Sequence, residues 1–94
     1  MRRFRNYEGP RIAEEVTVAR NVLVLKGKEI VYGLFKKGDL YYVSVRYSEE
    51  ISSALIGDSF FDAVIIYEKL VKNLVTPCTL RYVIDDYFLE KQNA

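Results

Sequence analysis

The chain has 94 residues, of which half are apolar and 29% are charged, and its formal net charge is +1. This balance excludes an intrinsically disordered chain, and the length suits one hydrophobic core. A nearly neutral molecule also exerts little long-range attraction on polyanions. The single cysteine cannot form an internal disulfide, and no apolar run approaches the roughly 18 residues that span a bilayer. We therefore expect a cytoplasmic protein without a membrane segment.

The first eleven residues form a basic segment. Four arginines, among them Arg2, Arg3 and Arg5, stand against the single acidic side chain of Glu8. Such arginines occur at the start of signal peptides, but the apolar stretch that must follow them is missing. We interpret residues 1–11 as a flexible basic tail and residues 12–94 as a single domain.

Short runs of β-branched and aromatic residues, separated by turns that contain glycine, predict strands in the first half of the domain. Residues 16–25 indicate one long bent strand, or two short strands joined at Arg20 and Asn21. A turn at residues 26–28 leads to residues 29–35. These are apolar on both faces after the first position, which indicates a central strand.

Two further predicted strands complete the sheet. Gly38 can adopt a positive φ and predicts a hairpin connection at residues 36–39. Side chains alternate along residues 40–48, and the set expected to face the core is Tyr41, Val43, Val45 and Tyr47. Residues 51–56 indicate a weaker strand at an edge of the sheet.

The apolar period changes to that of a helix in the last third of the chain. Ser59, followed three residues later by Asp62, resembles a capping box and predicts a helix from Phe60 to about Leu74. Phe60 and Leu74 belong to the expected apolar stripe of this helix, with Ala63, Val64, Tyr67, Leu70 and Val71. Asp62 is expected on its polar side.

Pro77 ends the first predicted helix, and Thr79 is a candidate cap for a second one. The apolar face of this second helix is formed by Leu80, Val83, Ile84, Tyr87 and Phe88. The order of elements predicts an α+β fold, with an antiparallel sheet of three to four strands followed by two C-terminal helices packed on one face.

Cys78, between the two predicted helices, is the first candidate for chemistry. The sequence has no histidine, so only a helix end remains to activate the thiol. A free cysteine in this position is more often a small buried hydrophobic residue, and we adopt that interpretation. Glycine-rich phosphate loops, zinc-ligand spacings and serine–histidine pairs do not occur. The sequence therefore predicts no enzyme, no cofactor and no metal.

Asp85 and Asp86 lie off the apolar face of the second predicted helix. Adjacent helical residues point about 100° apart and no third ligand accompanies the pair, so solvated charge is a better interpretation than a metal site. Packing demands neither these aspartates nor Asn73. We therefore include all three residues in a candidate interaction surface.

The chain is also rich in aromatic residues, with eight tyrosines and five phenylalanines. Tyr32, Tyr42 and Arg46, near Lys36 and Lys37, are candidates for an aromatic and basic sheet face on which single-stranded nucleic acid stacks. Tyrosine is also a strong strand former and a common residue in protein interfaces. We favour a surface for a protein partner or for self-association over a surface for nucleic acid.

The segment from Asn73 to Phe88 resembles a family of small uncharacterised proteins from Gram-positive, mainly clostridial, bacteria. The shared pattern is N-L-V-T-P-x-T-L, followed by two variable residues, a valine, another position, an acidic pair and an aromatic residue. Matching residues are Asn73, Leu74, Val75, Thr76, Pro77, Thr79, Leu80, Val83, Asp85, Asp86 and Tyr87. Cys78 occupies the variable position. The resemblance implies a bacterial origin and brings no activity with it.

These observations predict a non-enzymatic regulatory or accessory module that acts through protein contacts, with a homodimer as one form. An unpaired strand edge, which needs covering, supports the same view. The alternative is a nucleic-acid-associated regulator, for example an accessory factor of a mobile element. It would use Arg2, Arg3 and Arg5 together with the tyrosine-rich sheet face.

Overall fold

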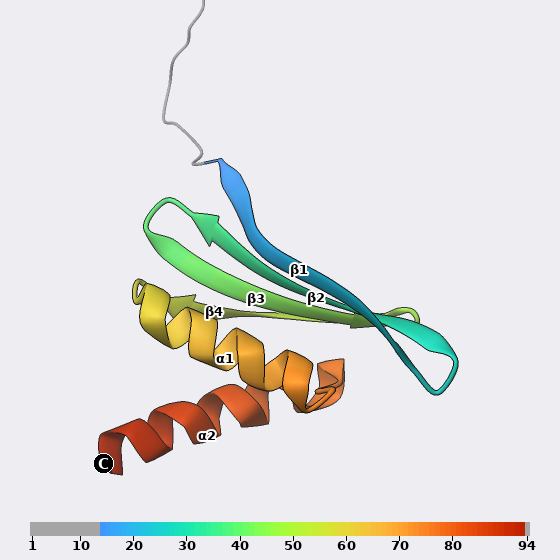
Figure 1. Ribbon diagram of the computed structural model, residues 1–94. Coiled ribbons are helices and arrows are strands. Elements are labelled where there is room, and N and C mark those ends of the chain that lie inside the picture. Colours follow the sequence, from blue (N-terminus) through green and yellow to red (C-terminus); the bar gives the residue numbers. More distant parts are fainter. Residues whose placement is uncertain (1–13, 94) are drawn as a thin grey trace, which may run out of the picture.

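The computed structural model describes residues 14–93, so the predicted basic tail with Arg2, Arg3 and Arg5 lies outside the described residues. Within that range a sheet is followed by two helices, as the sequence predicts (Figure 1). The elements are β1 (Glu15–Leu25), β2 (Lys28–Lys37), β3 (Leu40–Tyr47), β4 (Glu50–Gly57), α1 (Phe60–Lys72), the short 3-10 helix η1 (Pro77–Thr79) and α2 (Leu80–Asn93).

The four strands form one antiparallel sheet in the order β1-β2-β3-β4. Residues 16–25 belong to one long strand, and its register shifts by a bulge between Thr17 and Ala19. Lys26 and Gly27 both have positive φ, of 54° and 81°, as two-residue hairpin turns with the right twist require. The predicted α+β architecture is therefore confirmed.

Both helices pack on the same side of the sheet, which we call the helix-side face (Figure 1). Cα partners in an antiparallel pair share a face, and Tyr32 is the partner of Val45. Both side chains are fully buried under the helices. The predicted inward set of β3 is confirmed, since Val43 and Val45 are buried and Tyr41 and Tyr47 pack against the core.

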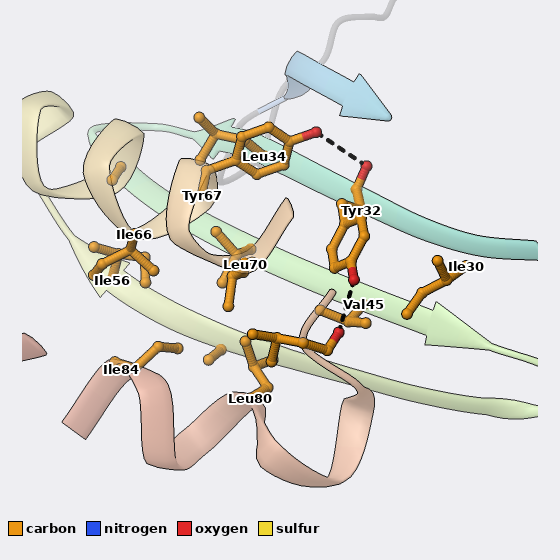
Figure 2. Close-up of a cluster of buried hydrophobic side chains, with 14 residues drawn as sticks. Ile30, Tyr32, Leu34, Val45, Ile56, Ile66, Tyr67, Leu70, Leu80 and Ile84 are labelled. Carbon is orange, nitrogen blue, oxygen red and sulfur yellow. Dashed lines mark hydrogen bonds between the residues drawn. The ribbon is translucent and has the colours of Figure 1, made fainter. Parts of the chain in front are cut away.

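Tyr32 joins the sheet to the connection between the helices (Figure 2). Its hydroxyl donates a hydrogen bond of 3.0 Å to the Val75 carbonyl, which follows α1. The Tyr67 hydroxyl, from α1, donates to Asn21 Oδ1 at 2.6 Å and lies 3.3 Å from the Tyr32 carbonyl oxygen. Burial raises the pKa of the Tyr32 hydroxyl. The buried Tyr32 hydroxyl thus has a hydrogen-bond partner, as polar groups in a protein core require.

Asn73 marks the end of α1 and has no packing role. Asn73 is the C-cap, and Leu74 follows in the left-handed region with φ 51°. The Val75 amide then donates to the Leu70 carbonyl at 3.0 Å, and the Leu74 amide donates to Val71 at 3.3 Å. This pair of bonds is the Schellman motif that closes many helices, and it turns the chain so that Val75 enters the core.

The apolar stripe of α1 differs from the predicted one. Ile66 and Leu70 are fully buried, whereas Phe60 and Leu74 are exposed, and Asp62 is buried. The difference arises because α2 packs on a flank of α1 in addition to the sheet. The buried side is therefore rotated toward Asp62. No helix within residues 14–93 is long and apolar enough to cross a membrane.

The Tyr32 hydrogen bond yields a test of the core. Replacing Tyr32→Phe leaves the Val75 carbonyl unpartnered and should lower the free energy of unfolding by about 1–2 kcal/mol in urea titrations. Tyr82→Phe is the control because this side chain is 71% exposed, and it should change the value by less than about 0.5 kcal/mol. Equal effects of the two substitutions would contradict the role of the bond.

Candidate functional site

Within residues 14–93 no helix or strand covers the side of the sheet opposite the helices, and we call this side the outer face. Its members follow from the register, because Phe35 pairs with Tyr42 and Tyr42 with Leu55, one position away from the buried partners. The apolar and aromatic residues of the outer face are Val22, Val24, Val31, Phe35, Leu40, Tyr42, Ile51 and Leu55.

Several of these side chains are open to solvent to an extent that is unusual for large aliphatic residues in a sheet. The exposed fractions are 67% for Val24, 66% for Ile51, 52% for Leu55 and 42% for Val22. Single exposed apolar residues are common on proteins, but several on one face, joined here by Val31, Phe35 and Tyr42 on the middle strands, are typical of an interaction site. The outer face is therefore the first candidate site.

An aromatic pair occupies the middle strands of the outer face. The Phe35 ring lies against the backbone of Gly33, where an added Cβ would stand only 2.5 Å from Phe35 Cζ. Gly33 therefore allows the ring to lie low on the sheet next to Tyr42, its cross-strand partner. The small side chains of Ser44 and Ser53 leave a hollow of about 360 Å³ beside this pair.

The charged residues of the outer face carry both signs. Glu15 is the cross-strand partner of Lys37, and Arg46 lies between Val31 and Ile51. Arg20 and Glu29 also lie on this face by register. Lys36, which was expected near a basic surface, lies on the helix-side face, with its Nζ 5.8 Å from the centre of the Tyr41 ring. A uniformly basic face is therefore absent from the sheet.

The predicted tyrosine surface is wrong in one member. Tyr32 is fully buried on the helix-side face, whereas Tyr42 and Arg46 lie together on the outer face. The reason is the alternation of strand residues: Tyr32 pairs with Val45, so it points away from Tyr42. Phe35 takes the place next to Tyr42 that the sequence interpretation gave to Tyr32.

The other predicted surface residues do not join this site. Asp85 and Asp86 are exposed on α2, which packs on the opposite side of the sheet. Asn73 is exposed at the end of α1, where it serves as the cap. The structure therefore distributes the candidate interaction residues over two sides of the protein.

Cys78 is exposed, so its predicted burial is wrong. The 3-10 turn directs Pro77 into the core and leaves Cys78 outside. Its Sγ lies 3.4 Å from Thr76 Oγ1. The Thr79 hydroxyl, a predicted helix cap, donates instead to the Thr76 carbonyl at 3.1 Å.

Asp62 is the centre of a charged cluster that sequence reasoning missed. Lys91 Nζ lies 2.8 Å and 2.7 Å from the two carboxylate oxygens, and the Tyr87 hydroxyl donates to Oδ1 at 2.7 Å. The Ser59 hydroxyl oxygen accepts from the Asp62 amide at 3.1 Å, which confirms the predicted cap. The side chain of Asp62 is 7% exposed, so the carboxylate is held away from water.

The hydrogen bond from Lys91, followed by that from Tyr87, lowers the pKa of Asp62 below its ordinary value. The same bond to Asp62 raises the pKa of the Tyr87 hydroxyl. Each polar group of this cluster has a partner within it, which indicates a structural connection between α1 and α2. Among the described residues, no group of three or more histidine, cysteine, aspartate or glutamate side chains is placed to hold a metal ion.

A second hollow lies between β1 and α1. It has a volume of about 360 Å³ and is lined mainly by apolar residues, including Val18, Ala19, Leu34, Val64 and Val71. It exists because the helices cover β2, β3 and β4 more closely than β1. The titratable residues of its lining are Tyr67, Glu68 and Lys72, and the Tyr67 hydroxyl is engaged with Asn21.

Comparison with known proteins adds no family to this geometry. No family model matches the chain, and neither the curated proteins nor the solved structures give a match. The resemblance of the C-terminal segment to a clostridial family therefore stays a prediction.

The Asp62 cluster predicts a defined response to acid. Because its pKa is lower in the folded state, the unfolded chain takes up the proton first, and stability should fall as the pH drops below the ordinary value of 3.8. Asp62→Asn should weaken this dependence and reduce stability at neutral pH by about 1 kcal/mol, a modest value because Lys91 is half exposed.

Urea unfolding at a series of pH values provides the measurement. Asp85→Asn, on an exposed position of α2, is the matched control and should leave the acid dependence unchanged. An unaltered acid dependence in Asp62→Asn would show that another carboxylate is responsible.

Proposed function

We propose that the protein is a non-enzymatic interaction module of the bacterial cytoplasm that binds a protein through the outer face of its sheet, in a regulatory or accessory role. The observation that carries the proposal is the exposure of Val22 and Val24 on β1 and of Ile51 and Leu55 on β4, all on the outer face, with Val31, Phe35 and Tyr42 on the strands between them. Burying this surface removes apolar area from water, at roughly 25 cal/mol per Å².

The composition of the outer face favours a protein over a nucleic acid. Nucleic-acid surfaces combine stacking aromatics with a basic groove that follows the phosphates. Here Lys37 is paired with Glu15 across the strands, and Glu29 lies beside Val24 at the other end of the face. The two aromatic residues, Phe35 and Tyr42, are cross-strand partners on the middle strands, and Leu55 lies next to Tyr42. Apolar and aromatic residues interspersed with charges of both signs are typical of protein interfaces.

Each polar group of the Asp62 cluster is hydrogen-bonded to another member of the cluster, which favours a binding role over catalysis. Its carboxylate, the Tyr87 hydroxyl and the Lys91 ammonium are engaged with one another, and the cluster lies between the helices. A catalytic acid or base needs access to a substrate proton, which this arrangement does not offer.

Site-specific photo-crosslinking in the producing cell tests the proposal. A photoreactive amino acid at Ile51 probes the outer face, and one at Leu89 probes an equally open position on α2, with exposed fractions of 66% and 57%. We expect a protein adduct from position 51 that position 89 does not give. Adding Leu55→Asp should remove most of that adduct, because a charge is placed within the apolar surface.

Adducts with nucleic acid at position 51 would favour the alternative, a nucleic-acid-associated regulator. Protein adducts of equal yield at both positions would contradict a specific role of the outer face.

A further inference from the structure

We infer that the outer face binds a second copy of this chain, so that two sheets stack face to face about a two-fold axis. The inference rests on the proposed function and names the partner. Two observations lead to it: the dimensions of the face and the placement of its charges. Neither depends on the helix-side residues.

The dimensions of the outer face favour a partner of equal size. Four strands about 4.8 Å apart, each with at least eight residues at about 3.3 Å, cover roughly 500 Å² in projection. Stable interfaces bury about 800 Å² per partner, with about 500 Å² as a lower limit. Protruding side chains make the buried area larger than the projected area. The face reaches the area of a stable interface only if nearly all of it is covered. A second copy presents a sheet of the same length and width.

The order of the strands makes the outer face complementary to itself. With the two-fold axis parallel to the strands, β2 lies over β3 of the second copy and β1 lies over β4 of the second copy. Phe35 then faces Tyr42, and Val22 faces Ile51, because these pairs share rows of the register. Apolar residues thus meet at these two places, with strands aligned as in stacked sheets.

The same two-fold axis brings charged residues of opposite sign together. Arg46 lies over Val31 of the second copy, and Glu29 is the next residue on that side of β2, two positions along the strand. A side chain as long as arginine reaches across this distance, so each copy contributes one Arg46–Glu29 pair. The symmetric arrangement produces the pair twice.

An arrangement that joins the sheets edge to edge through β1 fits less well. The bulge between Thr17 and Ala19 changes which face each residue occupies, so Val16 is on the helix-side face and Val22 on the outer face. A bulge of this kind disturbs continuous pairing with another strand. Such an edge pairing would also leave the apolar outer face uncovered.

Sedimentation equilibrium on the full chain tests the inference. The wild type should be a dimer at tens of micromolar, and Ile51→Asp should raise its dissociation constant by roughly tenfold or more, because the new charge is buried without a partner. Leu89→Asp, the matched substitution of an exposed leucine on α2, should leave the dissociation constant unchanged. A wild-type monomer, or equal effects of both variants, would overturn the inference.

A charge exchange tests the axis. Arg46→Glu and Glu29→Arg should each weaken the dimer by roughly tenfold, and combining both in one chain should restore it to within about threefold. Additive weakening in the double variant would contradict this arrangement of the two sheets.

Thiol labelling separates failure of the inference from failure of the proposed function. Ser53→Cys adds a thiol on the outer face, and the native exposed Cys78 is the internal reference on the helix side. The inference predicts protection of the introduced thiol in the purified protein as its concentration rises. Protection only in cell extract would overturn the inference and retain the proposed function. Equal reactivity in both conditions would overturn the two together.

Discussion

The burial of Tyr32 determines which side of the sheet becomes the core and which remains open. Its ring is enclosed by the helices, and its hydroxyl bonds to the Val75 carbonyl at 3.0 Å. Strand residues alternate between the two faces, so the position of Tyr32 also fixes the faces of Phe35 and Tyr42. A shift of one residue in register would place both sets on the wrong side. The open outer face is thus a direct consequence of how the core is built.

The helices depend on connections at both ends. Asp62 joins the start of α1 to the last turns of α2 through Lys91 and Tyr87, and the Schellman turn after α1 brings Val75 under Tyr32. Two short helices held in this way cover one face of a four-stranded sheet, and no other element within residues 14–93 covers the opposite face (Figure 1). The described residues therefore present an apolar face that water covers only at a free-energy cost, and this constraint is the basis of the proposed interaction role.

Much of this fold is predictable from local sequence. The glycine turns predict where the strands lie, and the alternation in residues 40–48 predicts which side chains face the core. The Ser59 cap predicts the start of α1. The sequence did not reveal the partner of Tyr32, because side-chain direction in β2, apolar on both faces, depends on register with β3. It also missed Asp62, since a carboxylate near a helix start is usually solvated and its partner Lys91 is 29 residues away. Residues 29–35 did contain a signal for the outer face: Val31 and Phe35 are apolar where one-sided burial would not require it.

We infer that the outer face is the contact surface between two copies of the chain. Isotope-filtered nuclear Overhauser spectra of a mixture of labelled and unlabelled chains test it most directly, because they detect only contacts between copies. The account predicts contacts between the methyl groups of Val22 in one copy and Ile51 in the other. A sample that is dimeric by mass but shows intermolecular contacts only from α1 or α2 would contradict it.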